Sequence, residues 1–391
     1  MELMNLLGVL VAFVASFVVV ATVHSRVMKW AVQHNVVDNP NYRKLQREPV
    51  PVLGGVAVFF GLVVGLCVAT PFIDIKPLLP VLMAMSVMLC IGVMDDVSGL
   101  SPWFRFLVEI VVTMLLVFLA GMSLDTFQGL WGVYGVPMWL SVPLTVVAVV
   151  GIINAINLID GVDGLSSGYC IMASVAFGVL YFKVNSLSAI VMCAISIGSL
   201  LPFFFHNVFG KKSKMFIGDG GSLMMGVVMS SYVIASISSG GACDKCVDMG
   251  IGLVPFTLAV MCVPVFDTVR VMFMRILRHT SPFHPDKTHL HHLFIEMGFS
   301  HFGTTMSVLS LNLLVVLCWL LSYKLGASID VQFYVVMISG VMLTAGFYKF
   351  MRIQIARNSA ILQRMTNFGA KTHVGDKKWW GALQRAVDLK Q

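Results

Sequence analysis

The chain has 391 residues, of which 58% are hydrophobic and 12% are charged, and its mean hydropathy is +0.89. Soluble globular domains carry about 25% charged residues, so this composition excludes a soluble enzyme and predicts a membrane protein. We attribute the formal net charge of +7 to membrane topology and contact with anionic lipids, and we expect no nucleic-acid partner.

Apolar runs with few or no charges, long enough to cross a bilayer, recur along the chain. A spanning helix needs roughly 20 mostly apolar residues, and about eleven such cores are separated by polar, Gly or Pro punctuation. The pattern predicts an all-α polytopic membrane protein with its transmembrane catalytic domain at 1–350. A basic cytoplasmic tail at 351–391 carries Trp379 and Trp380, which suit a membrane surface. The expected cores are 4–23, 54–70, 78–94, 106–120, 138–153, 167–181, 189–205, 222–237, 251–274, 304–321 and 331–350.

The distribution of positive charge predicts the orientation. When the loops are grouped on alternate sides, every Lys and Arg except Lys76, Lys183, Lys245 and Lys324 falls on one side. Cationic loops stay cytoplasmic, so we expect a bacterial inner-membrane protein with an external N-terminus and a cytoplasmic C-terminus.

Two of the eight cysteines, Cys243 and Cys246, form a CxxC in a loop assigned to the outside. Two thiols without a second ligand pair make a poor zinc site, so a local disulfide or no role at all is the favoured interpretation.

Four polar islands all fall on the side of the cationic loops. Ionisable groups near the membrane are costly and usually functional, so we interpret the islands as one active site at the cytoplasmic face. They contain Asp95 and Asp96; Asn154, Asn157, Asp160 and Asp163; Asn207 and Asp219; and His284, His289, His291 and His292.

The first two islands favour phosphate and nucleotide chemistry. Adjacent carboxylates such as Asp95 and Asp96 repel unless a cation intervenes, which suggests a metal site or a general base, against a solvent-facing turn. In NAINLIDGVDG, Asn or Asp recurs at every third residue from 154 to 163. Whether helical or looped, this segment presents acceptors for a uracil edge, ribose hydroxyls or metal-bound water.

The other two islands are suited to bind phosphates. Asp219 lies between glycines at the start of an apolar run, which fits a Mg²⁺ diphosphate site or a Gly-rich turn capped by Ser222. The spacing of an ATP-binding P-loop is absent. Arg275, Arg278 and the HxHH segment at 289–292 are interpreted as donors to phosphates, in preference to a zinc site, because no HExxH pattern exists.

Together with the loop VDNPNYRKLQREPVPVLGG, the islands resemble the polyprenyl-phosphate N-acetylhexosamine-1-phosphate transferase family from about residue 37 to 292. The sequence SPFHPDKTHLHH at 281–292 resembles the SPFxPDxxHxHH of its WecA-type branch. The MraY-type branch, which uses UDP-MurNAc-pentapeptide, differs in this loop and carries KxGTPTMGG where this chain has REPVPVLGG.

The resemblance implies a role for each candidate residue. Asp95 and Asp96 would act on the lipid phosphate, with Asp95 as the base, and Asp219 with Asp160 would hold Mg²⁺, with Mn²⁺ as a substitute. Phe216 would stack on uracil. The remaining donor-side residues are Arg47, Asn157, Asp163, Asn207, Arg275 and Arg278, and the catalytic histidines are His289, His291 and His292. Gln46 and Val52 replace the His and Arg of many members, which leaves the contact of that loop open.

The expected reaction transfers a sugar-1-phosphate, most simply N-acetylglucosamine-1-phosphate, from a UDP-N-acetylhexosamine to undecaprenyl phosphate and releases UMP. It would be the first membrane step of a cell-surface polysaccharide such as the O-antigen of lipopolysaccharide. The alternatives are an MraY-type reaction, a covalent aspartyl intermediate, and a secondary transporter, which predicts midplane charges and an inverted repeat. A homodimer is left open.

Overall fold

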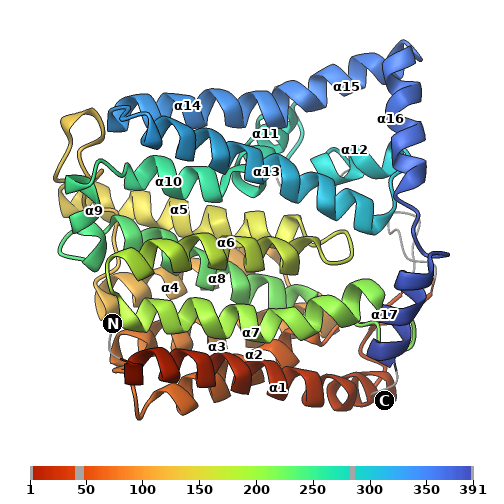
Figure 1. Cartoon of the computed structure of the whole chain (residues 1–391), viewed down its shortest axis with the longest axis horizontal. Helices are drawn as coiled ribbons and strands as arrows, with labels where there is room; N and C mark the ends of the chain where they lie inside the picture. Colours follow the sequence, from red (N-terminus) through yellow and green to blue (C-terminus); the bar gives the residue numbers. More distant parts are fainter. Residues whose placement is uncertain (1–2, 40–47, 282–286, 389–391) are drawn as a thin grey trace.

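The computed structural model describes residues 3–39, 48–281 and 287–388, and this part of the chain is mostly helical, which confirms the all-α expectation (Figure 1). Two short strands, β1 (Val37–Asp38) and β2 (Val50–Pro51), pair antiparallel. The longer helices are α1 (Leu3–Gln33), α2 (Gly54–Ala69), α3 (Leu79–Ser98), α4 (Pro102–Ala120), α5 (Met138–Leu158), α6 (Leu165–Lys183), α7 (Leu187–Phe209), α8 (Gly218–Ile237), α10 (Leu253–Val260), α11 (Cys262–Leu277), α13 (His301–Lys324), α14 (Ile329–Val341), α15 (Phe347–Ala356), α16 (Ala360–Lys371) and α17 (Lys378–Asp388). The shorter ones are η1 (Lys76–Leu78), η2 (Leu130–Gly132), η3 (Ala242–Asp244), α9 (Lys245–Asp248), α12 (Leu290–Glu296) and η4 (Met342–Gly346).

Nine helical segments within the described ranges are long and apolar enough to cross a membrane. They are α1, η1 with α3, α4, α5, α6, α7, α8, α13, and the segment from α14 to α15. The bent pair α10 and α11 could form one more span, and α2 is a shorter apolar helix. Because these helices overlap every expected core, the polytopic membrane fold is confirmed, while the number of helices that cross stays a prediction.

Helix α8 occupies the centre of the bundle, and 94% of the residues in its most apolar stretch are buried. Small and apolar residues cover all its faces, as expected for a helix surrounded by others. A Cβ on Gly92 of α3 would lie 2.4 Å from the Cα of Gly220, and one on Gly226 would lie 2.6 Å from the Cα of Ile153 in α5. Glycine therefore permits backbone contact that places the start of α8 beside the ends of α3 and α5.

The expected core at 251–274 is not one straight helix, because the chain bends by 75° between α10 and α11. Pro264 has no backbone N–H to donate to the carbonyl of Val260, so that oxygen needs other donors. It accepts hydrogen bonds from the hydroxyl of Tyr169 and from Nδ2 of Asn312 (3.0 Å), whose Oδ1 accepts from the amide of Val263 (2.9 Å). Side chains from α6 and α13 thus provide hydrogen-bond partners for the backbone groups that the bend leaves without an intrahelical partner.

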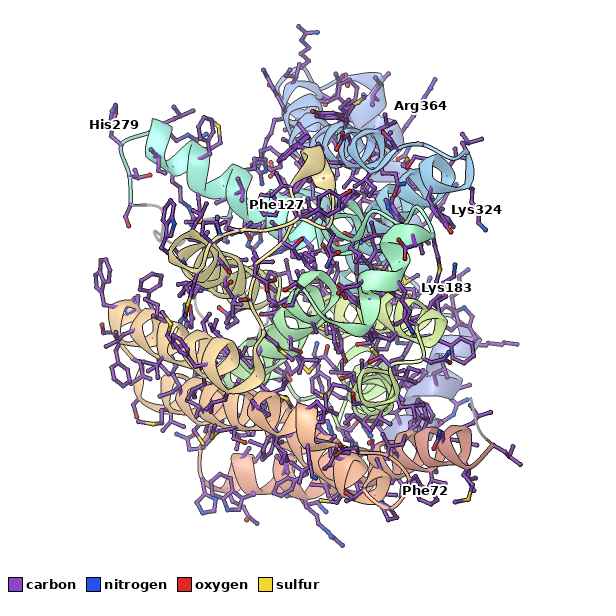
Figure 2. The ribbon with its side chains drawn as sticks, turned by 90° about the vertical axis from the view of Figure 1, so that its left-hand side faces the viewer. Phe72, Phe127, Lys183, His279, Lys324 and Arg364 are labelled. Atoms are coloured by element: carbon purple, nitrogen blue, oxygen red, sulfur yellow. The ribbon has the colours of Figure 1, made fainter. Side chains whose placement is uncertain are left out.

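The two ends of the bundle differ. In Figure 1 the chain termini lie at opposite ends, and α16 and α17 lie across the helix ends beside the C-terminus. Figure 2 looks onto the other end, where Lys183 and Lys324 close α6 and α13. This separation agrees with the grouping of loops by charge, but which end faces the cytoplasm stays a prediction.

The C-terminal segment folds back onto the protein. The apolar segment Ile329–Ala356 runs through the expected domain boundary at residue 350. After α16 the chain returns as α17, where Trp380 packs on Phe209 of α7 with ring centroids 4.7 Å apart. The neighbouring Trp379 is 46% exposed, so only this tryptophan remains suited to the expected contact with a membrane surface.

Cys243 in η3 and Cys246 in α9 are both buried free thiols. The structure therefore holds no disulfide between them, and it leaves the CxxC without an assigned role.

We expect single cysteines at Lys212→Cys and Lys287→Cys to react from the cytoplasmic side only, and Lys183→Cys and Lys324→Cys from the outside only. A membrane-impermeant maleimide applied to intact cells and to inverted vesicles measures this, with a parent protein lacking reactive native cysteines as the control. Labelling of all four from one side would contradict the topology.

Candidate active site

A cavity of about 870 Å³ lies where the ends of α3, α5 and α7 meet the start of α8. Segments from both halves of the chain contribute to its wall, including the N-terminal end of α13 and one face of α17. The predicted site residues in this wall are Asp96, Asn157, Asp160, Asp163, Asn207, Phe216, Asp219 and His292.

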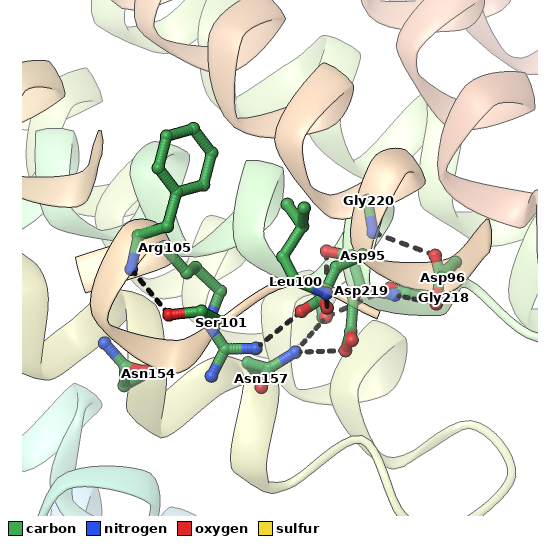
Figure 3. A network of polar contacts seen from close by, with 12 residues as sticks. Asp95, Asp96, Leu100, Ser101, Arg105, Asn154, Asn157, Gly218, Asp219 and Gly220 are labelled. Carbon is green, nitrogen blue, oxygen red and sulfur yellow. Dashed lines mark hydrogen bonds and ion pairs between the residues drawn. The ribbon is translucent and has the colours of Figure 1, made fainter. Parts of the chain in front are cut away.

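Asp96 binds the first turn of α8. Its carboxylate accepts from the amides of Asp219 (3.1 Å) and Gly220 (3.3 Å), which have no intrahelical acceptor of their own (Figure 3). Gly218 precedes them with φ of 72°, and a Cβ there would lie 2.2 Å from the carbonyl oxygen of Val52. The glycine in GDGG is therefore required by a left-handed turn in close contact with a second backbone.

The loop around β2 holds Phe216 at the cavity. The amide of Phe216 donates to the carbonyl of Pro51 (2.8 Å), and its carbonyl accepts from the amide of Gly54 (2.9 Å). The ammonium of Lys214 lies 5.8 Å from the centroid of the Phe216 ring. The backbone of Phe216 is thus held on both sides, and the stacking of its ring on uracil stays a prediction.

Asp95 takes a different position from its neighbour and does not line the cavity. Its carboxylate accepts from the amide of Leu100 (2.6 Å) and forms an ion pair with Arg105 (3.1 Å), as Figure 3 shows. Arg105 also lies 3.8 Å from the buried Glu109, which accepts from Nδ2 of Asn154 (2.5 Å). The first Asn of the every-third-residue pattern therefore belongs to this network and not to the cavity wall.

The remaining members of that pattern face different partners. Helix α5 continues through Asn157, whose Nδ2 donates to Asp219 (2.7 Å) and to the hydroxyl of Ser222 (2.9 Å). The chain then turns, and Asp160 accepts a hydrogen bond from the hydroxyl of Ser166 in the first turn of α6. The pattern is thus part helix and part turn, and Asn157 orients Asp219.

Asp163 interacts with two basic side chains, Lys214 and His301. It pairs with Lys214 (2.7 Å) and His301 (2.9 Å) through Oδ2, while its Oδ1 is buried without a partner among the described residues. Burial alone would raise the pKa of Asp163, but His301 and Lys214 lower it below its ordinary value, so this group is ionised at neutral pH.

Asn207 fixes the adjoining turn between α5 and α6. Its Oδ1 accepts from the amide of Gly164 (2.6 Å), and its Nδ2 donates to the carbonyl of Met215 (2.9 Å). Both ends of its amide are therefore used to hold two loops of the cavity together, and its place near the nucleotide stays a prediction.

The partners of Asp96, Asp160 and Asp219 are neutral groups: backbone amides, a hydroxyl and a side-chain amide. Burial, together with the like charges of Asp219 and Asp163, raises the pKa of Asp160 to about 7, although the hydrogen bond from Ser166 lowers it in part. Within the described ranges, no three His, Cys, Asp or Glu side chains form a metal-binding group by themselves. Mg²⁺ prefers one or two carboxylates completed by water and substrate phosphates, so these residues fit that ion.

Behind the cavity, a buried ion cluster positions the histidine motif. Asp267 of α11 accepts from Nδ1 of His289 (2.9 Å), from the amide of Leu290 (3.1 Å) and from Arg270 (2.6 Å). Since the carboxylate only accepts, Nδ1 of His289 carries the proton. The guanidinium of Arg270 also stacks on Tyr348 at 3.8 Å. His289 is thus held in one orientation and lies outside the cavity wall.

The other predicted residues of this region divide between wall and surroundings. His292 lines the cavity, and His291 packs against Gly161, where a Cβ would lie 2.8 Å from its Nε2. Burial holds the pKa of His291 well below its ordinary value, so it is neutral at pH 7. Arg275 is buried and Arg278 is exposed, and neither lines the cavity. Arg47 and His284 lie outside the described residues.

Sequence reasoning missed five residues that hold the site together. Glu109 and Asp267 interrupt apolar runs, and the cost of burying a charge in a membrane helix could have identified them. Arg105, Lys214 and His301 gave no such signal. Lys214 and His301 contact Asp163 although they lie 51 and 138 residues from it in the chain, respectively.

Comparisons with known proteins agree with this description. Residues 78–237 match the model of glycosyl transferase family 4. A probable undecaprenyl-phosphate N-acetylglucosaminyl 1-phosphate transferase of Bacillus subtilis (strain 168) is 30% identical over 318 residues, which cover 79% of this chain and 83% of the relative. The undecaprenyl-phosphate alpha-N-acetylglucosaminyl 1-phosphate transferase of Haemophilus influenzae is 31% identical, with 75% and 80% covered, and that of Escherichia coli K12 is 27% identical, with 76% and 79% covered.

The polytopic helical fold and the match over most of each relative place the protein in a class of membrane-embedded transferases. The chain belongs to glycosyl transferase family 4. Among its members it is similar to the undecaprenyl-phosphate N-acetylglucosaminyl 1-phosphate transferases, which confirms the WecA-type resemblance.

We expect Asp267→Asn to lower the melting temperature in detergent far more than Glu296→Gln does. The Asp267–Arg270 pair is buried, and breaking such a pair costs about 3–5 kcal/mol. The Glu296–Arg352 pair is exposed, and such pairs contribute about 0–1 kcal/mol. The control is matched because both arginines stack on Tyr348, and equal shifts would contradict the role of the buried cluster.

Proposed function

We propose that the protein transfers N-acetylglucosamine-1-phosphate from UDP-N-acetylglucosamine to undecaprenyl phosphate. An oxygen of the lipid phosphate attacks the β-phosphorus of the nucleotide sugar. The bond from that phosphorus to the bridging oxygen breaks, UMP leaves, and the lipid diphosphate sugar forms.

The observation that carries this proposal is the convergence of Asp96, Asp160, Asp163 and Asp219 on one cavity in a member of glycosyl transferase family 4. Both substrates are anions that must meet, so a site for this reaction needs groups that bind a cation as well as groups that bind the nucleotide. The related proteins named above also favour N-acetylglucosamine over the MurNAc-pentapeptide of the MraY-type alternative. Family membership likewise disfavours the secondary transporter.

Mg²⁺ would be held by Asp219 and Asp160, with Asn157 orienting Asp219 through its 2.7 Å hydrogen bond. When bound, the ion would screen the charge of the diphosphate and stabilise the departing UMP. The two carboxylates contribute ligands, and the substrate phosphates complete the shell, as this ion prefers.

Asp95 and Asp96 have different roles in this proposal. Asp96 faces the cavity and lies against the start of α8, so it is the member that can reach the lipid phosphate. Asp95 is engaged with Arg105 and would position the end of α3. The sequence-based choice of Asp95 as the base stays a prediction, and the geometry favours Asp96.

On the donor side, Asp163 and Phe216 would bind the nucleotide. Asp163 is held ionised by Lys214 and His301, which suits it to accept hydrogen bonds, and Phe216 offers a ring in the cavity wall for stacking. His292 in the wall would donate to a phosphate. A cytoplasmic location of this end of the bundle, with the C-terminus inside, follows from the charge distribution.

The test of the proposal is an assay of the purified protein with undecaprenyl phosphate and a panel of UDP-sugars, including UDP-MurNAc-pentapeptide. Release of UMP together with formation of a lipid-linked N-acetylglucosamine is the expected result. No product with any amino-sugar donor would overturn the proposal.

Asp219→Asn is expected to abolish transfer and leave the fold intact, because the ion loses its main anionic ligand. Chelation by EDTA should abolish the activity of the unchanged enzyme, and added Mg²⁺ should restore it. The measurement is UMP release, with melting temperature as the control for folding. Full activity of the variant would reject the metal assignment.

Asp96→Asn and Asp163→Asn should separate kinetically. The first should reduce kcat steeply with UDP-sugar binding preserved, because it acts on the acceptor side. The second should weaken UDP-sugar binding by about 1–3 kcal/mol, the loss expected for a charged hydrogen-bond partner. Calorimetric binding and steady-state kinetics measure both effects. Reversed phenotypes would mean that Asp96 lies on the donor side and Asp163 on the acceptor side. A larger loss of kcat in Asp95→Asn than in Asp96→Asn would identify Asp95 as the base.

A further inference from the structure

The C-terminal helix α17 forms part of the cavity wall although its first residue, Lys378, lies 86 positions after His292 in the chain. Trp380, Gln384 and Asp388 are spaced four residues apart, so they lie on one face of the helix. Trp380 and Gln384 line the cavity that holds the four aspartates. The inward face of α17 is therefore part of the site and not only a tail.

Asp388 fastens this helix to the turn after α7. Its two oxygens accept from the amides of Lys211 (3.3 Å), Lys212 (3.4 Å) and Ser213 (3.1 Å) and from the hydroxyl of Ser213 (2.8 Å). Consecutive amides that converge on a carboxylate form an anion-binding nest. Burial tends to raise the pKa of Asp388, but these bonds lower it overall, so the carboxylate is ionised near neutral pH. The nest belongs to the turn that leads to Lys214, the partner of Asp163.

Trp380 supplies the apolar half of the attachment. Its ring packs on Phe209 of α7, with centroids 4.7 Å apart, and edge-on against Phe302 of α13 at 5.6 Å. It also lines a second cavity of about 370 Å³, which shares Asp163 and His301 with the larger one. The tryptophan thus lies at the border between two spaces that both reach the nucleotide-side carboxylate.

The position of α17 favours one substrate. Figure 1 shows α16 and α17 lying across the ends of the bundle helices beside the C-terminus. The ends of membrane-spanning helices are where such a bundle meets water. A water-soluble nucleotide sugar must enter from this end, whereas the chain of a polyprenyl lipid stays between the helices and the bilayer. A tryptophan ring with one adjacent amide, such as that of Gln384, is also typical of a pocket wall that binds a polar organic ligand.

We propose that α17 closes the donor side of the active site: Trp380 and Gln384 contact the UDP-sugar, and Asp388 latches the helix over it. This inference rests on the proposed function for the identity of the donor. It adds a specificity-determining segment to the site, since a donor with a different sugar or base must fit beneath the same helix.

The test compares Trp380→Ala and Asp388→Ala with Trp379→Ala in the purified full-length protein. Trp379 is the matched control, because it is adjacent and aromatic but does not line either cavity. We expect the first two variants to raise the KM for UDP-N-acetylglucosamine about tenfold, with the KM for undecaprenyl phosphate and the melting temperature near those of the unchanged enzyme. A shifted acceptor KM in place of the donor KM, or an equal effect of Trp379→Ala, would overturn the inference.

Hydrogen exchange of the unchanged protein provides a readout that needs neither a variant nor turnover. UDP-N-acetylglucosamine should slow amide exchange in 378–388, whereas undecaprenyl phosphate alone should not. Absence of protection by the nucleotide sugar in an enzyme that turns it over would reject the role of α17 and leave the proposed function intact. Protection without turnover would reject the proposed reaction and keep α17 as a nucleotide-sugar contact.

Discussion

The bond between the Asp96 carboxylate and the first amides of α8 is the constraint on which the site depends. It joins residues 123 positions apart and satisfies backbone donors that have no partner within the helix. The buried core of α8 then helps to position Asp219, because Gly92 and Gly226 bring the backbone of α8 into close contact with α3 and α5. A carboxylate at a helix start is favourable in itself, so the same interaction stabilises the bundle and presents Asp219 to the cavity.

The acidic residues fall into two electrostatic classes. Asp95 and Asp163 each form an ion pair with a cation, Arg105 for the first and Lys214 for the second, and Asp163 also contacts His301. Among the described residues, the hydrogen-bond partners of Asp96, Asp160 and Asp219 are neutral donors that fix their orientation, and in the proposed function a bound ion would balance their charge. A cluster of like charges is costly in a desolvated site, and a cation brought with the substrate diphosphate relieves that cost. The proposed chemistry thus depends on which carboxylates have no cationic hydrogen-bond partner in the described part of the chain.

The histidine motif is positioned by the bend between α10 and α11. The bend between α10 and α11 needs Tyr169 and Asn312 to satisfy the freed backbone, and it directs α11 so that Asp267 meets His289. An intact helix across 251–274 would carry Asp267 elsewhere. The break is therefore part of the architecture that orients His289, and Arg270 stacks on Tyr348 in the last long apolar segment.

The sequence by itself determined the membrane class, the positions of the apolar helices and the family. These depend on the chemistry of the residues alone: uncharged runs of spanning length, and aspartates, asparagines and histidines in a fixed order. It also predicted that the polar islands would gather, and Asp96, Asp160, Asp163 and Asp219 do line one cavity.

Only the tertiary structure decided which of two neighbouring residues faces that cavity. Asp95 and Asp96 are adjacent and chemically identical, but their side chains leave the helix in different directions, one toward Arg105 and the other toward α8. The packing of α17 against the cavity could not be predicted from the sequence either. The residues that Asp388 contacts lie 175 to 177 positions away in the chain, and no local pattern encodes them. Long-range packing sets such pairings, and a single sequence carries no local signal for them.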